Sequence, residues 1–269
     1  MKISVISVGG AGRCCFYLGM VKNLLLSCSD DVGYVSKKGY SYCYHEVFRL
    51  SDQTLSLDER LPDPRDRNLI CELCMDDGYG GRTSIKWVDV KSEHLQGGCY
   101  NEDWTAVHGS DCIMICLDGS DLENATGSTQ EIADYWYENS NSLGNGGDID
   151  NFMRNYLRLN NGKLPFICFV VTKMDTMDPN LLKCTTLDRI VSRTFPDWFE
   201  GRTRNGGHIA AVCPISALGY EFMDGGPFNP VNAEKPLLAA LKVVSGKTYG
   251  DLDGVRFYRD GKWIDESEV

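Results

Sequence analysis

Short apolar runs bounded by turn residues recur along the chain, which is the pattern of buried parallel strands. The six runs that fit this pattern cover residues 3–8, 68–74, 83–90, 112–117, 165–171 and 208–213. Apolar residues at helical spacing fall between most of them, over residues 14–26, 128–138, 149–159, 178–194 and 231–244. This alternation predicts a three-layer α/β fold, with a mainly parallel six-stranded sheet and helices on both faces.

The second and third predicted strands have no helix between them. A turn rich in glycine and aspartate at residues 76–81 joins them directly, which predicts an antiparallel pair. Near the C-terminus, Asp260-Gly261 separates two apolar runs and predicts a β-hairpin. We therefore expect one domain over residues 1–247, with insertions near 27–67 and 139–150, and a hairpin extension over 248–269.

Composition and charge narrow the range of partners. The formal net charge is −11, and an acidic chain repels the phosphate backbone of nucleic acids. No apolar run approaches the ~20 residues that span a bilayer. The chain opens with a strand-like run in place of a secretory leader. We expect a cytoplasmic protein that binds neither nucleic acids nor membranes.

The chain holds 12 cysteines, which are thiols in a reducing compartment. Cys112, Cys116 and Cys168 lie in apolar runs, so we expect them to pack as small core residues. Cys71 and Cys74 have the spacing of a metal-binding pair, but no similar second pair follows. Alternation of side chains within a strand explains these two thiols better than a zinc site does.

A glycine-rich turn follows the first strand and leads into a helix. Such a turn directs backbone N–H groups at a phosphate near the helix N-terminus. The usual phosphate loop reads G-x-x-x-x-G-K-[ST], whereas here Ser7, Arg13 and Cys14 replace the first glycine, the lysine and the serine or threonine. The same turn also fits a dinucleotide-binding turn. The phosphate-binding candidates are Gly9, Gly10, Ala11, Gly12, Arg13, Cys14 and Cys15.

Two more motifs follow later strands. The fifth strand runs into Thr172-Lys173-Met174-Asp175, and the sixth is followed by Ser216-Ala217-Leu218. Together with the glycine-rich turn, these motifs stand at the carboxyl ends of strands, the edge where open α/β sheets bind ligands. We therefore expect three stretches that are far apart in the chain to meet at one rim of the sheet.

In this order the motifs resemble those of the P-loop GTPases, and the resemblance covers nearly the whole chain as a topology. Thr172-Lys173-Met174-Asp175 is similar to the [NT]KxD motif, in which the aspartate accepts two hydrogen bonds from guanine and the lysine stem packs over the base. Ser216-Ala217-Leu218 is similar to the SA[KL] motif, whose backbone contacts the guanine O6. The resemblance implies GTP or GDP as the ligand, and its guanine-binding residues would be Thr172, Lys173, Asp175, Ser216, Ala217 and Leu218.

Within this class, Asn229-Pro230-Val231 ahead of the last predicted helix and the strand pattern around Trp87-Val88-Asp89 resemble the bacterial double-GTPase or GTPase-associated families. Members of these families pair GTPase-like proteins with partner subunits. The resemblance therefore implies that the partners of this chain are other protein subunits.

The metal-binding positions depart from the GTPase pattern. Asp89 matches the aspartate of the DxxG motif, which orients Mg²⁺ through water, but Ser92 takes the place of its glycine. Because Mg²⁺ prefers oxygen ligands, the Cys14 thiol is a poor substitute for a hydroxyl. Arg13 keeps the positive charge of the usual lysine without its compact ammonium. These changes put Mg²⁺ binding in doubt.

The catalytic positions are also incomplete. Thr54 is the single threonine in residues 50–67, where a metal-binding threonine would lie. Glu93 and His94 fall where a water-positioning residue would stand, so they are the catalytic candidates.

These departures predict a degenerate GTPase that binds guanine nucleotide, hydrolyses it slowly or not at all, and acts as a regulatory or scaffold subunit. Three alternatives remain open. A partner could complete an active GTPase by supplying the missing groups, as arginine fingers do. A Rossmann-type NAD-binding enzyme would use residues 9–12, with Asp76 or Asp77 closing the second strand. A scaffold with an empty pocket would dock a partner through its acidic surface and the C-terminal hairpin, with Trp263 as the anchor.

Overall fold

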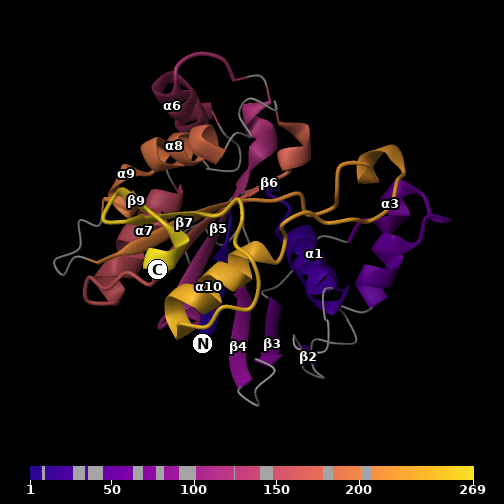
Figure 1. Cartoon of the computed structure of the whole chain (residues 1–269), viewed down its shortest axis with the longest axis horizontal. Helices are drawn as coiled ribbons and strands as arrows, with labels where there is room; N and C mark the ends of the chain where they lie inside the picture. The colour runs from indigo at the N-terminus through magenta and orange to yellow at the C-terminus, as the bar shows by residue number, and fades with distance from the viewer. Residues whose placement is uncertain are drawn as a thin grey trace.

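The computed structural model describes residues 1–7, 10–26, 34–35, 45–62, 69–76, 82–90, 101–123, 125–139, 148–177, 184–200 and 207–269. Within them, nine strands form a single sheet in the order β2-β3-β4-β1-β5-β6-β7-β8-β9 (Figure 1). The strands are β1 (Lys2–Ile6), β2 (Tyr34–Val35), β3 (Leu69–Asp76), β4 (Arg82–Asp89), β5 (Cys112–Asp118), β6 (Phe166–Thr172), β7 (Ile209–Pro214), β8 (Arg256–Arg259) and β9 (Lys262–Ile264).

The central strands β4, β1, β5, β6 and β7 run parallel to one another. β3 is antiparallel to β4, as the connection without a helix predicts. All six predicted strands are present, and each end lies within two residues of its predicted position. The prediction of an α/β fold with a mainly parallel sheet is therefore confirmed.

Helices cover both faces of the sheet. They are α1 (Arg13–Leu26), α3 (Leu57–Arg60), α5 (Asn101–Val107), α6 (Thr129–Asn139), α7 (Asp148–Leu159), α8 (Cys184–Thr194), α9 (Pro196–Phe199) and α10 (Lys235–Ser245), with a further helical stretch at residues 45–51. Short 3-10 helices are η1 (Gly119–Leu122), η2 (Met174–Thr176), η3 (Phe222–Asp224) and η4 (Glu266–Glu268). α1 and α10 pack on one face, and α6 to α9 pack on the other (Figure 1).

The strand β5 shows why the central runs are apolar throughout. Side chains alternate between the two faces of a strand, so Cys112, Met114 and Cys116 enter the core under α1 and α10. Ile113, Ile115 and Leu117 enter the core on the opposite face. Both sets are fully buried, which explains a run with no polar residue before Asp118. The predicted burial of the thiols is confirmed, including that of Cys168.

The Cys71 and Cys74 pair lies within β3. Residues three apart in a strand point to opposite faces, and accordingly Cys71 is buried while Cys74 is partly exposed. Among the residues that the structure describes, no group of three or more histidine, cysteine or acidic side chains could hold a metal ion. The thiols of this pair therefore cannot close on one ion without rebuilding the strand.

Part of the predicted insertion at residues 27–67 is ordered against the domain. The Arg60 side chain is 1% exposed, and its Nε and Nη2 donate to the carbonyl of Leu50 at 3.0 and 2.9 Å. Nη2 also lies 2.9 Å from the carbonyl of Gly226, and the guanidinium stacks over the Phe222 ring at 4.1 Å. These contacts attach the α3 segment to the loop that follows β7.

Two helix predictions need correction at their starts. The helix expected from residue 231 begins at Lys235, because Val231 instead forms an antiparallel bridge with Ser216. The expected helix at 178–194 is present from Cys184 onward, and residues 178–183 lie outside the described part of the chain. Residues 140–147, in the second predicted insertion, also lie outside it.

The C-terminal hairpin forms as predicted and continues the sheet. Asp260 and Gly261 have φ of 49° and 78°, the left-handed conformation that a two-residue hairpin turn requires. Because β8 pairs with β7, the hairpin adds two antiparallel strands beyond the parallel core. In the described residues, no helix is both long and apolar enough to traverse a bilayer.

Candidate functional site

The candidate site lies at the carboxyl edge of the parallel strands. β1 lies between β4 and β5, so the chain leaves β1 toward one side of the sheet and later crosses to the other side. Open α/β sheets bind ligands beside such a point, outside the carboxyl ends of the strands. The glycine-rich turn follows β1 at this point, and Asp89, Asp118 and Thr172 end the neighbouring strands at the same edge.

The glycine-rich turn leaves open space beside its backbone. Gly12 has a φ of +68°, and a Cβ added at Gly10 or Gly12 would meet none of the described atoms within 4 Å. α1 starts directly after the turn, and Phe16 N donates to Gly12 O at 2.8 Å. The positive end of the α1 dipole therefore points toward the glycine-rich turn, an arrangement that favours an anion there. Gly9 lies outside the described residues.

Ser7, at the position of the missing first glycine, is fully buried at the end of β1. Its hydroxyl has no hydrogen-bond partner among the described residues. A buried hydroxyl without a partner is costly, so a polar group of a ligand near this strand end would be favoured over an apolar one.

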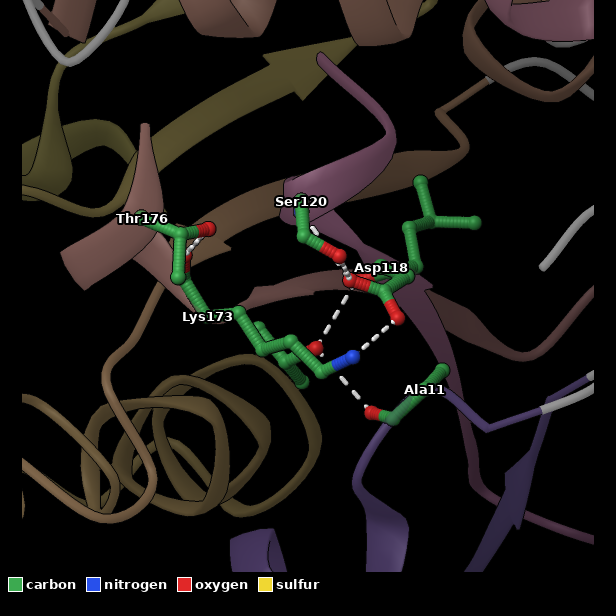
Figure 2. A network of polar contacts seen from close by, with 7 residues as sticks. Ala11, Asp118, Ser120, Lys173 and Thr176 are labelled. Carbon is green, nitrogen blue, oxygen red and sulfur yellow. Dashed lines mark hydrogen bonds and ion pairs between the residues drawn. The ribbon is translucent and has the colours of Figure 1, made fainter. Parts of the chain in front are cut away.

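Thr172 links the predicted base motif, residues 172–175, to the glycine-rich turn, which is predicted to bind phosphate. Its Oγ1 lies 3.0 Å from the carbonyl oxygen of Ala11 and 3.1 Å from that of Leu117 (Figure 2). The side chain is completely buried. The structure thus brings the turn after β1 and the motif after β6 into direct contact, as their positions at strand ends predict.

Lys173 is held by an acid that the sequence analysis missed. Its Nζ lies 2.5 Å from Asp118 Oδ2, and Ser120 donates from both N and Oγ to Asp118 Oδ1, at 3.0 and 2.5 Å (Figure 2). The Lys173 backbone is left-handed, with a φ of 54°, which turns the chain from β6 into η2. Asp118 ends the apolar run of β5, and this position at a strand end was the one feature of the sequence that could have marked it as a site residue.

Asp175 is bonded to the third motif. Ser216 Oγ donates to Asp175 Oδ1 at 2.5 Å and accepts from Gly219 N at 3.0 Å. Ser216 is fully buried and is fixed by its backbone bridge to Val231. The carboxylate is therefore oriented before any ligand arrives.

The rest of the third motif is packed against α1. A Cβ at Gly19 would lie 2.6 Å from the carbonyl oxygen of Ala217, so only glycine lets the helix approach this closely. Leu218 is partly exposed, and its carbonyl accepts from Asn229 N at 3.0 Å. The loop at Ala217 and Leu218 thus has a fixed backbone at the rim.

Tyr220 is a second residue that the sequence analysis missed. It lies two residues after the third motif and is 52% exposed. Partial burial and the Asp175 carboxylate raise the pKa of its phenol.

Arg13 and Asp89 form an ion pair at the phosphate end of the site. Arg13 Nη1 lies 2.5 Å from Asp89 Oδ1, and the two side chains are 12% and 5% exposed. The residues come together because β1 and β4 are adjacent and parallel, with Val5 opposite Asp89. Asp89 reaches the rim as predicted, but a guanidinium already occupies its carboxylate.

The residues at this position do not fit Mg²⁺. The aspartate expected to orient the ion is paired with Arg13, and the residue in place of the magnesium-binding hydroxyl is the Cys14 thiol. Burial also raises the pKa of the Cys116 thiol below this pair, so it stays protonated. Thr54 is exposed and bonds to Asp52 at 2.6 Å. Ser92, Glu93 and His94 lie outside the described residues.

The topology contradicts the Rossmann alternative. The usual Rossmann strand order is 3-2-1-4-5-6, with the second strand parallel and next to the first. Here β4 lies next to β1, and β3 lies beyond it and runs antiparallel. Asp76 therefore stands opposite Arg82 at the amino edge of the sheet, far from the glycine-rich turn. Asp77 lies outside the described residues.

A hollow lies at the opposite end of the sheet. It has a volume of about 570 Å³ and is lined by residues that precede β5, β6 and β7, including Asp111, Lys163 and His208. None of the predicted motif residues lines it. The rim is the stronger candidate, because it collects polar side chains from five segments that strand topology alone brings together.

Comparison with known proteins gives a likeness of fold only. No family model matches the chain, and no curated protein matches it. Among similar solved structures is the signal recognition particle receptor SRb-GTP/SRX complex from Chaetomium thermophilum, with a TM-score of 0.35 and 15% sequence identity. The match covers 72% of this chain and 79% of that chain. A likeness at this level supports no statement about function.

Proposed function

We propose that the chain binds a guanine nucleotide at the carboxyl edge of the sheet and hydrolyses it slowly or not at all. The observation that carries the proposal is the hydrogen bond from Thr172 to the carbonyl of Ala11, at 3.0 Å. It joins the segment suited to a base with the segment suited to phosphates. A nucleotide lying along this contact would reach both.

Asp175 gives the proposal its base specificity. Guanine presents two neighbouring donors, N1–H and the exocyclic amine, whereas adenine presents no such pair to a carboxylate. An ionised carboxylate accepts up to about four hydrogen bonds, so the bond from Ser216 to Oδ1 leaves capacity for a base. The adjoining Lys173 stem, 40% exposed, offers an apolar surface for the purine ring.

Weak hydrolysis follows from the phosphate end. Phosphoryl transfer depends on metal ions and positioned cations that neutralise the developing charge. In this chain, Asp89 is paired with Arg13 and a thiol stands in the hydroxyl position. We therefore propose a regulatory or scaffold role with other protein subunits as partners, supported by Trp263, which is 53% exposed on the hairpin.

The test is an exchange of base specificity. Thermal unfolding is measured with GDP, GTP, ATP, NAD and xanthosine diphosphate (XDP), for the wild type, Asp175→Asn and the control Asp224→Asn. Xanthine carries a carbonyl where guanine carries the amine, and an asparagine amide can donate to it. A ligand that binds only the folded state stabilises it, by about 2.7 kcal/mol at a hundred times its dissociation constant.

We expect GDP and GTP to stabilise the wild type and the control, with ATP and NAD without effect. Asp175→Asn should lose GDP and gain XDP, each by about tenfold or more in affinity, since one well-placed hydrogen bond to a charged group contributes about 1.5–3 kcal/mol. Stabilisation by ATP or NAD alone, or an Asp175→Asn variant that still prefers GDP, would show that the base assignment is wrong. The active-GTPase alternative requires turnover to rise when a partner protein is added.

A further inference from the structure

Arg13, a cation of the chain itself, is paired with the carboxylate of Asp89, the residue at the predicted metal position. Arg13 is the first residue of α1, and Asp89 is the last residue of β4. Their contact of 2.5 Å is almost shielded from water, with side chains 12% and 5% exposed. Partial burial strengthens the attraction between the two charges compared with a surface pair.

A divalent ion could engage Asp89 only by displacing this guanidinium. Arg13 cannot give up its charge, because a guanidinium stays protonated in proteins. The displaced side chain would then stand beside an ion of the same sign, tethered by the helix start. Cys14, the next residue, adds a thiol where Mg²⁺ needs a hard oxygen.

The guanidinium is itself suited to phosphate. It has five N–H donors in a planar fork, and the bond to Asp89 runs through Nη1. Arginine binds phosphate through paired, charge-assisted hydrogen bonds. Its position at the start of α1 puts it beside the N–H groups of the helix terminus and the open backbone at Gly12.

We infer that Arg13 takes the place of the divalent cation, so that the ligand of this site is a metal-free guanine nucleotide. The inference rests on the proposed function, since it assigns the form in which the proposed ligand binds. Asp89 positions the guanidinium and does not coordinate metal. The charge that meets the phosphates is fixed in the chain and independent of the magnesium concentration.

The test compares nucleotide affinity with EDTA and with excess MgCl₂, by calorimetric titration of GDP into the full chain. We expect the two dissociation constants to agree within about threefold. In parallel, Mn²⁺ with GDP is followed by electron paramagnetic resonance. The spectrum should stay that of the nucleotide complex in solution, with no protein-bound Mn²⁺ signal.

A variant with the usual phosphate-loop residues at positions 13 and 14 provides the converse test, because its nucleotide binding should depend on metal. Arg13→Lys combined with Cys14→Ser should bind GDP about tenfold or more tightly with MgCl₂ than with EDTA. Arg154→Lys, a substitution at a side chain 63% exposed on α7, is the matched control and should stay insensitive to metal. If the double variant does not fold, Cys14→Ser alone and the Mn²⁺ spectrum of the wild type decide.

The outcomes separate the two proposals. Wild type that binds GDP only with MgCl₂, or that shows bound Mn²⁺, overturns the metal-free inference while guanine binding stands. A folded restored variant that remains insensitive to metal overturns the assignment to Arg13. Wild type that binds no guanine nucleotide under either condition overturns the proposed function, and the inference with it.

Discussion

The candidate site has a proposed base half, with Asp175, and a proposed phosphate half, with Asp89, and these two carboxylates are oriented by different kinds of partner. In the base half, a neutral hydroxyl, that of Ser216, orients the Asp175 carboxylate, while the cation Lys173 pairs with Asp118 outside the motif. In the phosphate half, a cation and an anion of the site satisfy each other, Arg13 with Asp89. The proposed base recognition therefore depends on the geometry of the hydrogen bonds to Asp175. The proposed phosphate recognition depends on the balance of charge between Arg13 and Asp89.

Breaking the ion pair should give the largest effect. Arg13→Met leaves Asp89 buried without its cation, and removal of one partner of a buried pair costs about 3–5 kcal/mol. Asp89→Asn combined with Arg13→Met should cost less than the sum of the single variants, because the stranded charge is gone. Urea denaturation of the four proteins measures this coupling. If the unfolding free-energy changes of the two single variants simply added in the double variant, Arg13 and Asp89 would not stabilise each other.

Two glycines offer a matched comparison between the halves. Gly219, in the base half, has a φ of +100°, and an added Cβ would lie 2.3 Å from the carbonyl oxygen of Asn229. Gly219→Ala should cost about 2–4 kcal/mol, from strain and overpacking together. Gly12→Ala meets no described atom within 4 Å, so only the left-handed conformation is penalised, by about 1–2 kcal/mol.

Thermal unfolding of the two alanine variants checks the order of these costs. If Gly12→Ala were the more destabilising, the turn would be tightly packed, and the open space assigned to a phosphate would not exist.

The smallest expected effect is that of Ser120→Ala, which is compared with Ser216→Ala because both serines bond to a carboxylate at 2.5 Å. Ser216 is fully buried and also accepts from Gly219 N, so Ser216→Ala should cost about 1–3 kcal/mol and weaken GDP binding. Ser120→Ala, at a partly exposed site, should cost about 0.5–1.5 kcal/mol. Denaturation and GDP titration measure both. Equal costs would mean that burial does not determine how much a serine–carboxylate hydrogen bond contributes.

The elements of the fold were predictable because they follow from local periodicity. The six central strands and the hairpin turn at Asp260 and Gly261 required only the apolar runs and the residues that bound them. The helix start at residue 231 was wrong because Val231 bridges to Ser216, a contact that local sequence does not encode.

The sequence predicted where the candidate site residues lie in the fold, but not which side chains they bond to. The strand ends located Thr172, Asp175 and Ser216 at one rim. The pairing of Arg13 with Asp89 joins residues 76 positions apart and depends on which strands are neighbours. Asp118 was missed because a single acid after an apolar strand resembles any turn, and its bond to Lys173 exists only once β5 and β6 are paired.

The C-terminal hairpin also determines how the sheet ends. Without it, β7 would present a row of unpaired backbone groups, the kind of border along which proteins polymerise. β8 covers that border, and the outermost strand β9 is only three residues long, with exposed Lys262 and Trp263. A strand so short and charged is a poor template for a second copy, so this side of the molecule resists fibril-like stacking.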